Sequence, residues 1–209
     1  MKITSFKPLF AIDVALILIS SAISYAFLNG MIDTRPDLWN IDREWSVSET
    51  LNYLKCLTMA LVFFAAYLRD KQFLLIVMSV TAVFLLADDS LQLHERLGSN
   101  FANTFKLQDE FGLRAYTYGH IVIWGGLGSI ILLIIYRGWR TASSDLKKSL
   151  YPVFGYFFAI VFCAVGLDTL HELLDLPKIY KGIIGIFEDG GEMLFLTAML
   201  RYVWNTFRS

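Results

Sequence analysis

Long apolar runs separated by short polar segments dominate the chain. Six of these runs are long enough to cross a membrane, for which roughly 20 mostly apolar residues suffice. We place them near residues 9–28, 46–68, 73–95, 115–136, 152–174 and 183–204. Backbone polar groups find no water in the hydrocarbon core, so each span is expected to be a helix. The pattern predicts an all-α protein, a bundle of six transmembrane helices forming one membrane domain over residues 1–209.

The composition agrees with a membrane protein. Of 209 residues, 56% are hydrophobic and 18% are charged, against roughly 45–50% and 25% in a soluble domain. The net charge of −1 argues against a nucleic-acid partner. Cys56 and Cys163 each lie within an apolar run, so we interpret them as core residues and not as metal ligands. Membrane lipids are the expected surroundings.

The charges at the ends of the spans indicate an orientation. Lysines and arginines of the short loops slightly favour the side that carries both termini, which predicts cytoplasmic termini in the inner (plasma) membrane. The N-terminus also has features of a signal peptide, with Lys2, Lys7 and the sequence Ser24-Tyr25-Ala26. Because the apolar stretch is long and Asp13 interrupts its beginning, we interpret it as a retained first helix.

Acidic residues and histidines gather at one end of five successive spans. Of the 19 acidic residues, only Asp13, Asp70 and Asp145 fall in the cytoplasmic half of the predicted bundle. The histidines all fall in the opposite half. Ionisable groups inside a membrane are costly, and those that occur are usually functional. This layer, which faces the outer side, predicts the functional site.

Helical spacing places part of this layer on one face of the fifth predicted helix. Asp168 and His171 are three residues apart, the spacing by which a carboxylate and an imidazole of one helix can hold the same ion. Glu172 continues the same face one turn after Asp168.

The third predicted helix carries a similar stripe, in which Asp88, Gln92 and Glu95 follow the spacing i, i+4, i+7. His94 lies about 100° around the helix from Glu95, off this stripe. We therefore rank it below His120 and His171 as a site residue.

The connection after the third span, residues 96–114, is one of the longest outside the helices. Phe101, Phe105 and Phe111 alternate there with polar residues. This pattern is typical of a short amphipathic helix on the membrane surface. Such a helix would cover the outer ends of the bundle.

The layer has a large excess of acid, with Lys55 as the one fixed cation in it. Carboxylates in a low-dielectric site bind a cation, form a pair or become protonated. Carboxylates and imidazoles without thiolates suit zinc, iron or manganese, so we expect a divalent metal ion as cofactor. The expected ligands are Asp88, Asp168, His171, Glu192 and His120, with Glu172 and Glu188 as catalytic groups and Lys55, Gln92 and Asp89 as supporting partners.

A metal-dependent enzyme acting on a lipid-like or amphipathic substrate is the leading functional hypothesis, either a hydrolase or an oxidoreductase. A proton- or cation-coupled transporter or channel is the alternative. The cytoplasmic half is poor in polar groups, which favours a pocket over a conduit. A structural subunit of a membrane complex stays open, as does a homo-oligomer.

Overall fold

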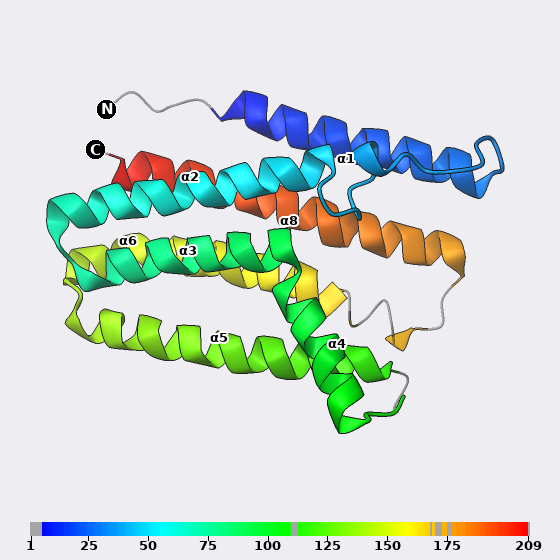
Figure 1. Cartoon of the computed structure of the whole chain (residues 1–209). Coiled ribbons are helices and arrows are strands. Elements are labelled where there is room, and N and C mark those ends of the chain that lie inside the picture. The colour runs from blue at the N-terminus through cyan, green and yellow to red at the C-terminus, as the bar shows by residue number, and fades with distance from the viewer. Residues whose placement is uncertain (1–5, 110–112, 168, 170–172, 175–176, 209) are drawn as a thin grey trace. The chain divides into compact units, whose positions relative to one another are not determined.

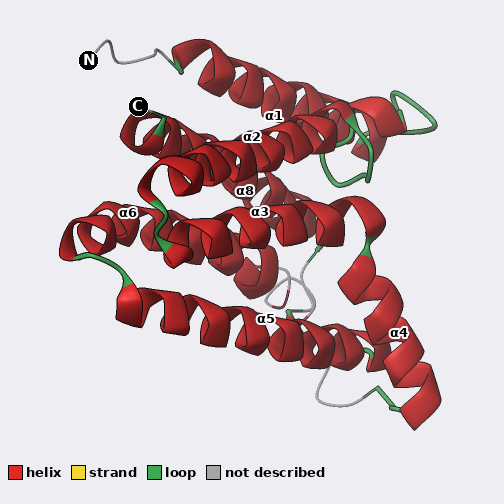
Figure 2. Cartoon of the chain, turned by 60° about the vertical axis from the view of Figure 1, so that its left-hand side comes forward, coloured by secondary structure: helices red, strands yellow, loops and turns green. Residues whose placement is uncertain are grey.

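The computed structural model describes residues 6–109, 113–167, 169, 173–174 and 177–208, and every regular element within these ranges is a helix. Figure 2 shows the helices and the loops that join them. The elements in chain order (Figure 1) are α1 (Lys7–Leu28), the short 3-10 helix η1 (Asp37–Trp39), α2 (Val47–Asp70), α3 (Phe73–Leu91), α4 (Leu93–Phe105), α5 (Ala115–Thr141), α6 (Ser144–Val161), the π-helical segment η2 (Phe162–Leu167) and α8 (Lys178–Phe207).

Five helices of the described chain are long and apolar enough to cross a membrane: α1, α2, α3, α5, and α6 continued through η2. This confirms the predicted all-helical class and fits an integral membrane protein. The sixth predicted span, residues 183–204, falls within α8 and is indeed helical. Glu188, Asp189 and Glu192 place three charged residues in the apolar part of α8, which is not among the five. A sixth crossing and the location of the termini therefore stay predictions.

The chain divides into two compact units, one formed by residues 1–58 and 149–209, the other by residues 59–148. In the first unit α1 packs against α8, and Leu16, Ile41 and Met193 form a buried core. A side chain added at Gly190 of α8 would lie 3.1 Å from Cδ1 of Ile17, so the two helices approach closely there. The loop after α1 folds back, because the backbone N–H of Ile41 donates to Oγ of Ser20 at 3.2 Å.

In the second unit α3 and α5 run antiparallel, and α4 crosses the first turns of α5 (Figures 1 and 2). A Cβ atom added at Gly138 near the end of α5 would lie 3.1 Å from Cδ1 of Leu74, at the start of α3. The backbone N–H of Ser143 donates to Oε1 of Gln72 at 3.0 Å and closes the same end. The end of α3 and the start of α5 consequently lie together at the other end of this unit.

The predicted end of the third span, at residue 95, is wrong. The helix stops at Leu91, Gln92 adopts a left-handed conformation with φ 51° and ψ 44°, and α4 begins at Leu93 in a new direction. The stripe expected from Asp88 to Glu95 is therefore interrupted. The short amphipathic helix predicted after this span is present as α4, although it begins earlier than expected.

The fifth predicted span also begins earlier than expected. Its helix starts at Ser144, and Pro152, taken as the first residue of the span, lies inside α6. At Phe162 the α-helix widens into the π-helical turns of η2. A side chain added at Gly191 of α8 would lie 2.8 Å from Sγ of Cys163. The cysteine is thus a packed core residue of the first unit, 5% exposed.

Candidate functional site

Asp88 and His94 form the central contact of the candidate site. The Asp88 side chain is 1% exposed, and its Oδ1 accepts the backbone N–H of His94 at 3.0 Å. Its Oδ2 lies 2.9 Å from Nδ1 of the same histidine. The first contact satisfies a backbone donor in the opening turn of α4, which the break at Gln92 leaves without a helical acceptor. The second favours the tautomer with the proton on Nδ1.

The surroundings of His94 favour its charged form. Partial burial lowers the pKa of the imidazole, but the hydrogen bond and the charge of Asp88, helped by Glu95 and Asp89, outweigh it. The net result is a pKa raised above the ordinary histidine value of 6.5. The His94 imidazole therefore keeps its proton to a higher pH than an ordinary histidine.

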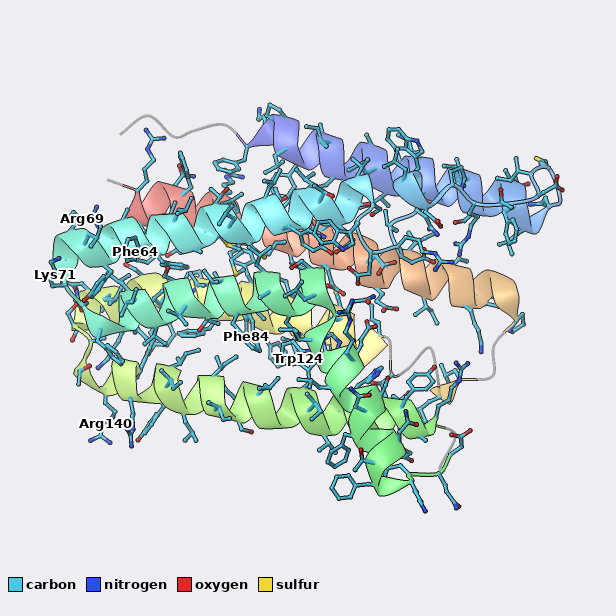
Figure 3. All side chains as sticks on the ribbon, in the orientation of Figure 1. Phe64, Arg69, Lys71, Phe84, Trp124 and Arg140 are labelled. Atoms are coloured by element: carbon cyan, nitrogen blue, oxygen red, sulfur yellow. The ribbon has the colours of Figure 1, made fainter. Side chains whose placement is uncertain are left out.

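His120 brings a second imidazole to the same place. Its ring centroid lies 6.0 Å from that of His94, with the two rings nearly perpendicular. Oγ of Ser99, on α4, lies 3.3 Å from Nε2 of His120. Tyr116 covers His120 at 5.4 Å between ring centroids, and Trp124, labelled in Figure 3, lies 5.9 Å from His94. Helices α3, α4 and α5 thus each contribute to one small cluster of polar and aromatic groups.

Two glycines allow the helices to meet at this cluster. A side chain added at Gly119 of α5 would collide with the backbone of Gly98 on α4. One added at Gly98 would lie 2.5 Å from Cδ2 of His120 and 2.6 Å from its backbone nitrogen. Ala102, 4% exposed, extends the small-residue contact on α4. Two helix backbones can approach this closely only where the facing residues lack a side chain. Gly98 and Gly119 therefore set the distance between α4 and α5, and with it the separation of the His94 and His120 imidazoles.

The first unit contains a different polar centre, around Lys55. Nζ of Lys55 donates to Oδ1 of Asp13 at 2.8 Å, to Oδ1 of Asn52 at 3.0 Å and to the carbonyl of Met193 at 3.3 Å. The hydroxyl of Thr197 donates to Oδ2 of Asp13 at 2.6 Å. The Lys55 and Asp13 side chains are 1% and 0% exposed. Every donor of the ammonium has an acceptor, as a buried charge requires.

The structure brings two of the predicted site residues, Asp88 and His120, together with His94. Asp89 is exposed and Gln92 forms the break after α3. Glu188 and Glu192 lie half-buried on α8 in the other unit, where Lys55 pairs with Asp13. The remaining predicted residues lie outside the described ranges, namely Asp168, His171 and Glu172.

A metal site is not complete within the described ranges. No group of three or more histidine, cysteine, aspartate or glutamate side chains in them is placed to hold a metal ion. The paired imidazoles and their carboxylate can hold and move protons, and they provide part of a metal-binding set. Sequence reasoning placed His94 away from Asp88 because it assumed a continuous helix through Gln92, and the break there brings the two side chains together. It also assigned Asp13 no partner, although a single acid and a single lysine in two apolar helices were a signal for a pair.

The profile of a family described as "Domain of unknown function (DUF8692)" matches residues 12–206. The match covers nearly the whole chain, so the protein belongs to this family. No curated protein and no solved structure matches the chain.

Proposed function

We propose that this member of the DUF8692 family is a membrane enzyme whose reaction centre is formed by Asp88, His94 and His120. The observation that carries the proposal is the contact between the buried carboxylate of Asp88 and Nδ1 of His94, at 2.9 Å. A carboxylate that is hydrogen-bonded to one imidazole nitrogen fixes the orientation of the ring. The other nitrogen can then act as a base, an acid or a metal ligand. A lipid-like or amphipathic substrate fits a centre built from membrane helices.

The proposed cofactor is a divalent metal ion, zinc, iron or manganese. His94 would bind it through Nε2, since Nδ1 is held by Asp88, and His120 would supply the second imidazole. Both Asp88 oxygens accept hydrogen bonds from His94, which favours an orienting role for this carboxylate over direct ligation. A complete metal site needs at least one ligand besides these two imidazoles. Asp168 and His171, the ligands expected from the sequence, lie outside the described ranges and stay predictions. When bound, the metal would activate water or polarise a substrate oxygen.

Elemental analysis of the detergent-purified protein tests the cofactor. We expect a near-stoichiometric divalent metal in the wild-type protein and its loss in His94→Ala and His120→Ala. Asn100→Ala, an exposed change on α4, is the control for purification and should keep the metal. In Asp88→Asn we expect metal affinity to fall by about 10–100-fold, the usual effect of removing the partner of a ligating histidine. A metal-free wild-type protein that also fails to bind added zinc, iron or manganese would refute the metal proposal.

Proton exchange is the second candidate, favoured by the raised pKa of His94. In that case the Asp88–His94 pair would bind and release protons for a coupled transport step, without a metal. Reconstituted vesicles with an enclosed pH dye distinguish this role. Proton flux that disappears in His94→Gln would support it, whereas equal flux in wild-type and variant vesicles would exclude it.

A further inference from the structure

Helix α4 has an apolar face that is exposed in the described structure. Leu97, Phe101 and Phe105 follow the spacing i, i+4, i+8 and so share one face. Leu97 and Phe105 are 48% and 64% exposed, and the rings of Phe101 and Phe105 pack at an angle of 38° with 4.5 Å between their centroids. The face that packs against α5 is a different one, formed by Gly98 and Ala102. The exposed stripe is therefore not part of the contact between α4 and α5.

The opposite face of α4 is polar. It exposes the side chains of Arg96, Asn100 and Asn103. With 13 residues the helix is about 20 Å long, too short to cross a hydrocarbon core of about 30 Å. A short helix with one aromatic face and one polar face is suited to the membrane–water boundary.

The neighbouring helices place α4 at that boundary. It starts one residue after α3, a candidate membrane span, and crosses α5, another candidate span, at Gly119 in its second turn. The end of α3 and the start of α5 mark the same edge of the hydrocarbon core. A helix that leaves this edge at an angle (Figure 2) can bury an apolar stripe in the adjacent lipid while its other face meets water.

We propose that the stripe Leu97–Phe101–Phe105 docks on the lipid hydrocarbon at this membrane boundary and seats His94 and His120 at the depth of the lipid headgroups. Resting on the function proposed above, this names the substrate class as a lipid that presents its headgroup to the two imidazoles from the plane of the membrane. His94 follows the first residue of α4, and His120 directly follows the glycine at which the helices cross. The depth of α4 thus sets the depth of both.

Spin labels on the two faces of α4 test the docking. Phe105→Cys and Asn103→Cys place a nitroxide on the apolar and the polar face, in a Cys56→Ala/Cys163→Ala background reconstituted in phosphatidylcholine vesicles. At 105 we expect a several-fold excess of collisions with oxygen, which dissolves in lipid, over those with a water-soluble nickel chelate. At 103 we expect the reverse. Nickel access at 105 equal to that at 103 would overturn the proposal, and low access to both reagents at 105 would show a protein contact, such as a second copy, instead of lipid.

The spin-label measurement depends neither on catalysis nor on a bound metal. Oxygen and nickel access at position 105 therefore tests the docking by itself. A wild-type protein that binds no zinc, iron or manganese while α4 lies docked in lipid would refute only the proposed function.

Discussion

Nζ of Lys55 and Oδ1 of Asp13 lie 2.8 Å apart, and the two side chains are almost fully buried. The two residues are 42 positions apart and belong to different helices, α2 and α1. Removing one partner would leave a charge or its unsatisfied hydrogen bonds inside an apolar unit. Taking two charges out of water is expensive, so an apolar pair of similar size would give the protein a similar or higher free energy of unfolding. The ion pair is therefore more important for the arrangement of α1 than for the stability of the protein.

Substitution of Lys55 or Asp13 alone is therefore expected to lower the free energy of unfolding more than substitution of both. Lys55→Met and Asp13→Leu should each destabilise the protein by about 3–5 kcal/mol, because each leaves its partner buried without compensation. The double variant should recover much of this loss. Unfolding in mixed detergent micelles measures both effects, and a double variant that loses the sum of the single losses would contradict the pairing.

Removal of the Thr197 hydroxyl tests the other side of Asp13. Thr197→Val keeps the shape of the side chain but leaves Oδ2 of Asp13 without the donor that lies 2.6 Å away. The expected loss of stability is about 1–3 kcal/mol, the cost of an unsatisfied buried group. Thr58→Val is a suitable control, since this exposed hydroxyl bonds only within its own helix. Equal losses for the two variants would argue against a special role of Thr197.

The stability of the second unit is expected to depend on the charge of His94. Its pKa is higher in the folded protein than in the unfolded chain, so the protonated imidazole stabilises the fold. This contribution is complete below pH 6.5, the ordinary value, and is lost as the pH rises through the raised folded pKa. Histidine NMR titration and unfolding at several pH values should show both effects. In Glu95→Gln the pKa should fall slightly, and in Asp88→Asn further; an unchanged pKa in Asp88→Asn would contradict the contact.

The crossing of α4 and α5 should not tolerate a side chain at Gly119. In Gly119→Ala the new methyl group collides with the backbone of Gly98, and we expect a loss of about 1–3 kcal/mol or more, together with displacement of His120. Gly125→Ala on the same helix is the matched control, because a side chain there meets nothing within 4 Å. Equal melting temperatures of the two variants would show that the helices do not meet at Gly119.

The break between α3 and α4 offers a stabilising change. Gln92 has a left-handed backbone that costs a residue with a side chain about 1 kcal/mol and costs glycine little. Gln92→Gly should raise the unfolding free energy by up to about 1 kcal/mol. If the helix instead continued through this residue, the same substitution would destabilise it by a similar amount, so the sign of the change tests the break.

The membrane helices could be predicted because length and apolarity alone define them. The break at Gln92 could not, since glutamine has no preference for a left-handed backbone and leucines on both sides continue the apolar pattern. The backbone conformation of Gln92 determines whether His94 lies near Asp88, so the prediction of the site depended on it. On a continuous helix His94 points away from the stripe of Asp88, whereas on a new helix it lies against the carboxylate. The partner of Lys55 was missed for a different reason. One acid and one lysine in two apolar helices indicate a pair only if the two helices are neighbours, and the order of helices in space does not follow from their order in the chain.

The Asp88 carboxylate fixes both the direction of the backbone at the start of α4 and the orientation of the His94 imidazole. A substitution at position 88 consequently alters the architecture and the chemistry together, and a loss of activity there has two explanations. Position 94 is different, because every residue except proline keeps the backbone N–H that donates to Asp88. Folding and reactivity can therefore be separated at His94 and not at its partner, although the partner is the more deeply buried of the two.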